Sequence, residues 1–177
     1  MRQRIDYKKV APNAYKAMLA IENYVRDSGL DHALLELMKT RVSQINGCAH
    51  CLDMHTKEAR ASGETEQRLH VLAAWRDAPF YSGRERAALA WAEALTQIST
   101  HAISDELFAE ARDHFGEKGL VDLTLAIIAI NGWNRLAVPF RAETGSYQPV
   151  RGAIASQQRS VHGTLPPAAH GLRKSGN

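Results

Sequence analysis

Apolar residues recur along most of this chain at the three- and four-residue spacing of amphipathic helices. Between positions 31 and 46, for example, Leu34, Leu37, Met38, Val42 and Ile45 form one apolar stripe. Glycines and helix-capping residues separate such stretches, as expected at helix ends. The pattern predicts helices over residues 12–26, 31–46, 48–61, 65–75, 82–98, 105–115 and 117–137.

No segment shows the period-two alternation of a half-buried strand, so the sequence predicts an all-α bundle of about six to seven helices. The last helix is apolar nearly all round, which indicates burial in the core or at a subunit interface. Asn131, Asn134 and Arg135 interrupt it. We expect these polar residues to face a cavity or, preferably, to bond across a subunit boundary. Residues 1–9 are polar and are predicted to be extended.

Length and composition favour a helical domain over residues 1–144 followed by a tail. The chain has 177 residues, of which 45% are hydrophobic, as is typical of one globular domain. Residues 145–177 are rich in Gly, Ser and Pro, and they contain four basic residues and no acidic one. We expect this basic tail to be mobile. The remaining domain is nearly neutral, which argues against nucleic acid as a partner.

The sequence also predicts a cytoplasmic protein without a membrane segment. The longest nearly continuous apolar run, residues 123–130, is much shorter than the roughly 20 residues that span a bilayer. The first residues, MRQRIDYKKV, have no apolar segment after their charges, so no secretory signal peptide is expected.

The chemistry of the chain is concentrated in one Cys-x-x-Cys segment. Cys48 and Cys51 are the only two cysteines, with His50 between them and His55 four residues further on. On a helix Cys48, Cys51 and His55 share one face. Gly47 places the pair in a first helical turn, where unpaired N–H groups favour a thiolate. We therefore favour a redox-active dithiol.

Two other interpretations of this segment stay open, namely a zinc site and inert buried thiols. A zinc ion would need a fourth ligand besides Cys48, Cys51 and His55, and no second spaced Cys or His pair follows. A c-type haem is excluded because Leu52, not histidine, follows Cys51. We predict no metal and no cofactor.

Glu36 is a less obvious candidate. It lies away from the apolar stripe of its helix, which is typical of a solvent-exposed carboxylate. Its neighbours on that side, Thr40, Ser43 and Gly47, are small, so another helix could approach closely and bury the carboxylate beside the dithiol.

The segment from Glu36 to His55 resembles the AhpD-like alkylhydroperoxidase family of the carboxymuconolactone decarboxylase superfamily. The family pattern is a glutamate, eleven residues, Cys-x-x-Cys, three residues and a histidine, and every position is present here. The stretch from Ile127 to Arg141 also resembles the closing helix of the superfamily. The similarity covers roughly residues 10–142 and implies an AhpD-like helical bundle.

The resemblance implies peroxidase activity with assigned roles. Cys51 would be the peroxidatic thiolate, and Cys48 would donate a proton and then form the Cys48–Cys51 disulfide. His55 would hold and deprotonate Cys51, Glu36 would orient His55, and His50 would assist near Cys48. The resemblance further implies a homotrimer or homohexamer that reduces hydroperoxides with electrons from a lipoyl domain or a thioredoxin-like protein.

Other functions remain open beside the peroxidase. They are a general dithiol–disulfide oxidoreductase, a cofactor-free decarboxylase of the same superfamily, and a non-enzymatic redox or zinc-binding module. The intact dithiol argues against the decarboxylase, whose chemistry does not need paired thiols.

Overall fold

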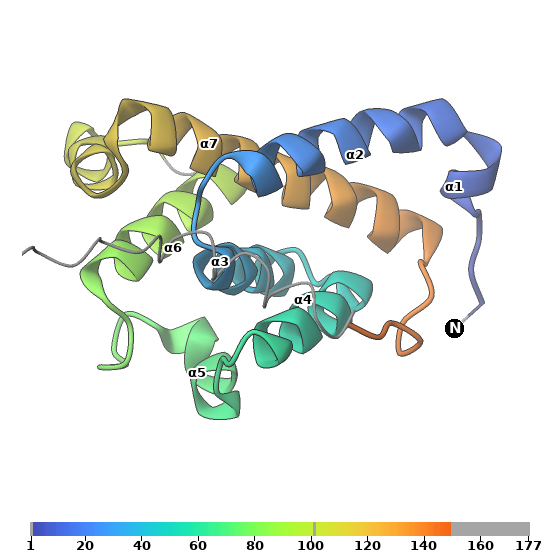
Figure 1. The fold of residues 1–177 in the computed structure, drawn as a ribbon, viewed down its shortest axis with the longest axis horizontal. Helices are drawn as coiled ribbons and strands as arrows, with labels where there is room; N and C mark the ends of the chain where they lie inside the picture. Colours follow the sequence, from blue (N-terminus) through green and yellow to red (C-terminus); the bar gives the residue numbers. More distant parts are fainter. Residues whose placement is uncertain (1, 101, 150–177) are drawn as a thin grey trace, which may run out of the picture.

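The computed structural model describes residues 2–100 and 102–149, and these residues form an all-α bundle without a strand, as predicted. Figure 1 shows the arrangement of the helices. They are α1 (Tyr7–Val10), α2 (Pro12–Asp27), α3 (His32–Ile45), α4 (Ala49–Ala61), α5 (Glu66–Val71), the 3-10 helix η1 (Leu72–Ala74), α6 (Gly83–Thr96) and α7 (Asp105–Phe140).

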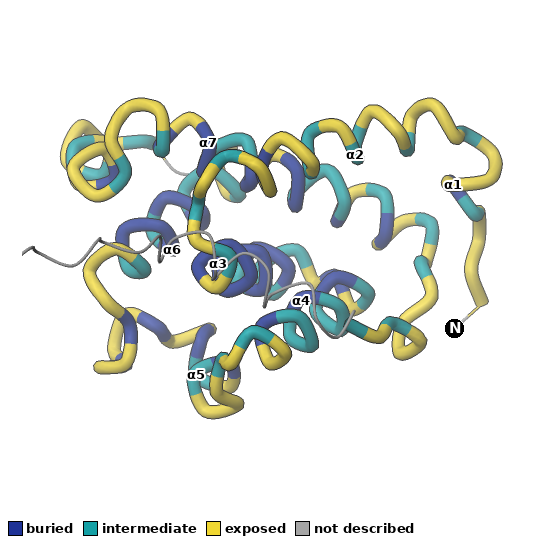
Figure 2. Tube along the Cα trace, in the orientation of Figure 1, coloured by how far each residue is buried: buried dark blue, intermediate teal, exposed yellow. Residues whose placement is uncertain are grey.

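Helix α3 is the centre of the bundle. Helices α2 and α7 lie on one side of it and α4 on the other, and α6 packs against it as well (Figure 1). Figure 2 shows α3 as largely buried. Four polar residues of α3 are buried together with its apolar residues: Glu36, Lys39, Thr40 and Ser43. The bundle therefore holds a row of polar side chains in its interior.

Capping side chains begin two of the helices where the sequence predicts. Asp31 accepts a hydrogen bond from the Leu34 N–H at 2.8 Å at the start of α3. At the start of α6, Ser82 and Glu85 form a capping box, in which each side chain accepts from the backbone N–H of the other residue.

The segments predicted as two helices, 105–115 and 117–137, run together as α7, but they meet at a kink where Gly116 has non-helical backbone angles (φ 68°, ψ 172°). The left-handed φ that glycine allows therefore separates two helical segments at the predicted position. Two other boundaries differ from the sequence prediction. Residues 7–10, predicted as extended, form a short helix that Asp6 caps. The predicted helix 65–75 changes to a 3-10 helix after Val71.

Helix α7 buries one side and exposes the other. Leu123, Ile127 and Ile130 lie in the core, whereas Val121 and Ile128 are more than half exposed. Among the described residues, α7 is the one helix long and apolar enough to cross a membrane, although the sequence predicts no such segment. A core helix passes the same test, and α7 packs against α2, α3 and α6, so this is weak evidence for a membrane span.

The segment after α7 folds back along α4. The Gly145 N–H donates to the Asp53 carboxylate at 3.0 Å, and the Lys57 ammonium donates to the Tyr147 carbonyl at 2.9 Å. The predicted tail begins at residue 145, so its first residues are held by α4 in this structure. The rest of it, residues 150–177, lies outside the described residues.

Candidate active site

The dithiol lies at the start of α4, directly after the turn that follows α3. Gly47 makes this turn with a left-handed φ of 63°. Cys48 is the N-cap of α4, and its Sγ accepts the N–H of Cys51 at 3.4 Å. Both thiols are reduced and about 1% exposed. A reactant therefore reaches them only after a local movement of the protein.

The two thiols are hydrogen-bonded to each other, and their pKa values differ. The hydrogen bond from the Cys51 thiol lowers the pKa of Cys48 to about 7, and the backbone N–H groups of Cys51 and His50 add to this effect. The same hydrogen bond, together with burial, raises the pKa of Cys51. The first thiolate therefore forms on Cys48, where the N–H groups of the helix N-terminus favour an anion. This differs from the resemblance, which implies the thiolate on Cys51.

Ultraviolet absorbance of the thiolate should show this charge directly. We expect the reduced protein to gain one thiolate as the pH rises through about 7, because the pKa of Cys48 lies there. Below that pH both thiols are protonated. Cys48→Ser removes the hydrogen bond and charge of Cys48 that raise the pKa of Cys51, but burial still raises it, so the transition should move to higher pH. A single transition near 9 in the unmodified protein would contradict this charge distribution.

Asn134 completes the surroundings of the dithiol from α7. Its buried amide donates to the Ser43 hydroxyl at 3.3 Å and also hydrogen-bonds both thiols, which lowers the pKa of each. Asn46 donates to the side-chain oxygens of Asn131 and Asn134, at 3.0 and 2.8 Å. Both asparagines of α7 therefore have hydrogen-bond partners within one subunit, and the favoured bond across a subunit boundary stays a prediction.

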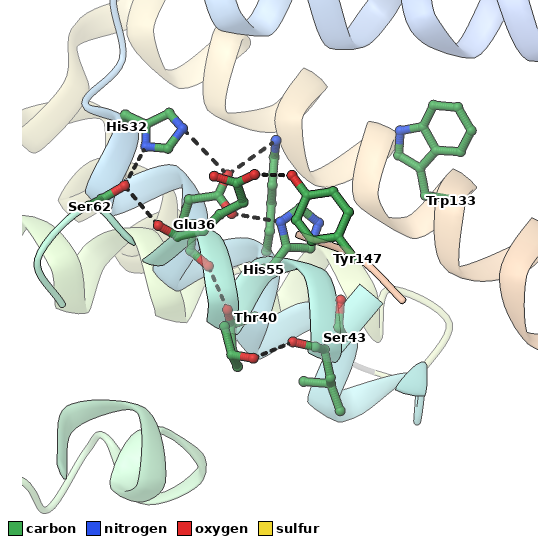
Figure 3. A network of polar contacts seen from close by, with 12 residues as sticks. His32, Glu36, Thr40, Ser43, His55, Ser62, Trp133 and Tyr147 are labelled. Carbon is green, nitrogen blue, oxygen red and sulfur yellow. Dashed lines mark hydrogen bonds and ion pairs between the residues drawn. The ribbon is translucent and has the colours of Figure 1, made fainter. Parts of the chain in front are cut away.

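Glu36 and His55 form a buried pair across α3 and α4. The Nδ1 atom of His55 lies 2.7 Å from the Glu36 carboxylate (Figure 3). Burial would raise the pKa of Glu36, but the charge and hydrogen bond of His55, with Lys39 and His32 nearby, lower it overall. Glu36 is therefore ionised and only accepts, so Nδ1 of His55 is the donor. The solvent-exposed interpretation of Glu36 is wrong, because α4 packs closely against this side of α3.

The other ring nitrogen of His55 is unpaired. Within the described part of the chain, the buried Nε2 atom has no hydrogen-bond partner. The contact that the resemblance implies between His55 and Cys51 is thus not formed in this reduced state. A buried nitrogen without a partner is costly, and functional sites are where such atoms occur. Nε2 is free to give a proton to a reacting group, or to accept one.

His50 does not direct its ring toward the dithiol. Its Nδ1 donates to the backbone carbonyl of Glu143, in the segment after α7. Only its backbone N–H supports the charge on Cys48. The expected assistance from the His50 side chain therefore has no geometric basis in this structure.

Two tyrosines lie beside the site, Tyr7 from α1 and Tyr147 from the segment after α7. Tyr7 is buried, packs its ring 6.1 Å from that of Phe140, and has a pKa raised to about 12 by burial and by the charge of the nearby cysteines. Tyr147 lies beside Glu36 and His55 and donates its hydroxyl to Glu58 (Figure 3). Across residues 2–100 and 102–149, no group of three or more His, Cys, Asp or Glu side chains is placed to hold a metal ion.

Fold and site together define a class, the all-helical proteins with a reduced Cys-x-x-Cys at a helix N-terminus beside a buried glutamate–histidine pair. Residues 12–94 match the model of the carboxymuconolactone decarboxylase family. YdfG of Bacillus subtilis, an uncharacterized protein, is 46% identical over 138 residues, which are 78% of this chain and 94% of YdfG. The chain belongs to the carboxymuconolactone decarboxylase family.

Two further relatives are AhpD-like. A protein of unknown function from Agrobacterium tumefaciens, suggested to be an antioxidant defence protein AhpD, superposes with a TM-score of 0.79 at 46% identity. That match covers 82% of this chain and all of the other. The alkyl hydroperoxide reductase AhpD of Corynebacterium aurimucosum is 40% identical over 47 residues, 27% of each chain. The AhpD-like fold that the sequence predicts is confirmed.

Proposed function

We propose that this protein is a thiol-dependent peroxidase that reduces organic hydroperoxides through Cys48 and Cys51. The observation that carries the proposal is the reduced dithiol with one acidified sulfur, next to a histidine whose second nitrogen is unpaired. An activated nucleophile, a resolving thiol and a positioned proton carrier are what this reaction needs. The similarity of the chain to AhpD proteins supports this proposal.

In the first step the Cys48 thiolate attacks the terminal oxygen of the hydroperoxide. The O–O bond breaks, and an S–O bond forms to give a sulfenic acid on Cys48. The leaving alkoxide takes the proton of the Cys51 thiol, which lies within hydrogen-bond reach of Cys48, and departs as an alcohol. This proposal exchanges the roles that the resemblance implies for the two cysteines.

In the second step the new Cys51 thiolate attacks the Cys48 sulfur. The S–S bond forms, and the hydroxide that leaves takes a proton from His55 and departs as water. This proton is the one that the Cys48 thiol gave up, so protons balance over the cycle. Glu36 holds His55 in place as a positioning residue. An external dithiol then reduces the disulfide by exchange, and we propose a lipoyl domain or a thioredoxin-like protein as its carrier.

A coupled assay tests this function. The reduced protein is given tert-butyl hydroperoxide with dihydrolipoamide as electron donor, and loss of peroxide is followed. We expect catalytic turnover in the wild type and none in Cys51→Ser. Reduction of disulfide substrates without any consumption of peroxide would instead show a general dithiol–disulfide oxidoreductase.

We also propose a homo-oligomer that covers the exposed side of α7. Val121 and Ile128 lie there, 59% and 51% exposed, on an apolar helix. A Val121→Glu/Ile128→Glu double variant should be smaller than the wild type in light scattering, because two carboxylates would then be desolvated at the contact. As the matched control, Glu106→Gln, an exposed position on α7, should leave the size unchanged. An unmodified protein that is monomeric at micromolar concentration would contradict the proposal.

A further inference from the structure

We propose that Lys39 is a positioning residue of this site, which sets the charge balance of the Glu36–His55 pair from inside the bundle. The inference rests on the proposed function only for its consequence on peroxide reduction. Its geometry belongs to the buried polar cluster of α3, which consists of Glu22, Glu36, Lys39 and His55.

Lys39 is a buried lysine between two carboxylates. Only 5% of the residue is exposed, and its Nζ hydrogen-bonds Glu22 of α2 and lies 3.9 Å from Glu36 Oε1. Lysines are almost never buried unless they are paired. Most lysines at the edge of a core extend their ammonium group to water. The ammonium group of Lys39 instead lies between Glu22, to which it donates a hydrogen bond, and Glu36, the carboxylate that holds His55.

Together with Trp133, the cluster joins four helices. Glu22 accepts hydrogen bonds from Lys39 and, at 3.2 Å, from the Nε1 atom of Trp133 on α7. Lys39 thereby links α3 to α2 and α7, while Glu36 links α3 to α4 through His55. The Glu36 carboxylate therefore lies between the ammonium group of Lys39 and the ring of His55.

The net charge of the cluster explains how Lys39 acts on His55. Glu22 and Glu36 carry two negative charges and Lys39 one positive charge, so one negative charge is left over. A protonated His55 ring balances it. This leftover negative charge lies beside the ring that the second reaction step uses as its proton donor, and Lys39 keeps it at one unit. Without Lys39, two negative charges would act on His55 and the ring would release its proton only at higher pH.

The other titratable groups around Glu36 do not replace Lys39. His32 of α3 lies 3.9 Å from Glu36, but 43% of its side chain is exposed to solvent. Tyr147, after α7, faces the cluster and donates its hydroxyl to Glu58 of α4. Lys39 is also among the groups that lower the pKa of Glu36.

Substitutions that change this charge by single units test the proposal. Lys39→Met should move the titration midpoint of the His55 ring, followed by NMR, to higher pH by about one to three units. The alkaline limb of the peroxidase pH profile, where the protonated His55 is lost, should move in the same direction. Glu22→Gln removes one negative charge and should move both to lower pH. Lys39→Arg keeps the charge and should restore the wild-type midpoint.

The double variant Lys39→Met/Glu22→Gln separates charge from structure. It has the same net charge as the wild type, so its midpoint should return to within about half a unit of the wild type. A merely structural role predicts instead that the double variant is the most perturbed of the three. Lys118→Met, which removes a lysine paired at 2.6 Å with the buried Asp122 on α7, is the matched control and should leave the midpoint in place.

Because NMR reads the ring itself, the result does not depend on peroxide reduction. Absence of turnover in the wild type would overturn the proposed function and leave this inference standing. An unchanged His55 midpoint in folded Lys39→Met would overturn the inference. If Lys39→Met does not fold, an unchanged midpoint in Glu22→Gln or a shifted one in the double variant would do the same.

Discussion

Cys51→Ser should stop repeated peroxide turnover and leave, after one oxidation, a stable sulfenic acid on Cys48. The serine hydroxyl still donates a hydrogen bond to Cys48, so the low pKa of that thiol is largely kept. Without a second thiol the sulfenic acid cannot be resolved. Trapping with dimedone, followed by mass spectrometry of the peptide, detects it. Loss of catalytic turnover should be complete within the limits of the assay.

Cys48→Ser is the matched variant and should behave differently. The remaining Cys51 loses the hydrogen bond with Cys48 that raises its pKa, but it stays buried, and burial also raises this pKa, so little thiolate is present at neutral pH. We expect almost no sulfenic acid on the time scale at which Cys51→Ser forms it. Rapid formation on Cys51, with none on Cys48 in the other variant, would contradict our assignment and restore the roles implied by the family resemblance.

Glu36→Gln should lower the rate of peroxide reduction by on the order of 100-fold, the loss expected when a proton-transfer group is no longer held and charged correctly. Glutamine keeps the size of the side chain but removes the negative charge that lies 2.7 Å from His55. The alkaline limb of the pH profile should move to lower pH, opposite to its shift in Lys39→Met. Steady-state rates measured between about pH 5 and 9 test both effects, because imidazole titrates within this range.

Glu58→Gln is the control for this substitution. Glu58 is also a carboxylate of this region, but it accepts the Tyr147 hydroxyl, and in the described structure it forms no hydrogen bond or ion pair with His55 or the thiols. We expect less than a threefold change in rate (about 0.6 kcal/mol at most). Equal losses in the Glu36 and Glu58 variants would show that Glu36 acts through general stability and not through His55.

Local signals in the sequence predict most of the fold. Asp31 and the Ser82–Glu85 pair mark helix starts because capping depends on residues close in the chain. The same local reasoning places Cys48 at a helix N-terminus. It also marks Gly116, where a non-helical backbone conformation separates the two segments of α7.

The surroundings of the dithiol depend on contacts that the sequence does not encode locally. A helical wheel places Glu36 and Lys39 off the apolar stripe, which is typical of exposed residues. They are buried because α3 is covered on several sides by other helices. Asn134 and Tyr147 reach the site from α7 and the segment after it. For Asn134 the signal was a polar residue within an apolar helix, whereas nothing in the sequence marked Lys39.

The most direct test of the central claim uses the reduced protein alone, with one molar equivalent of tert-butyl hydroperoxide and no electron donor. Peptide mapping by mass spectrometry then follows the two cysteines while the alcohol is quantified. We predict one Cys48–Cys51 disulfide for each molecule of alcohol formed. Peroxide that stays intact while both thiols stay reduced would contradict the account.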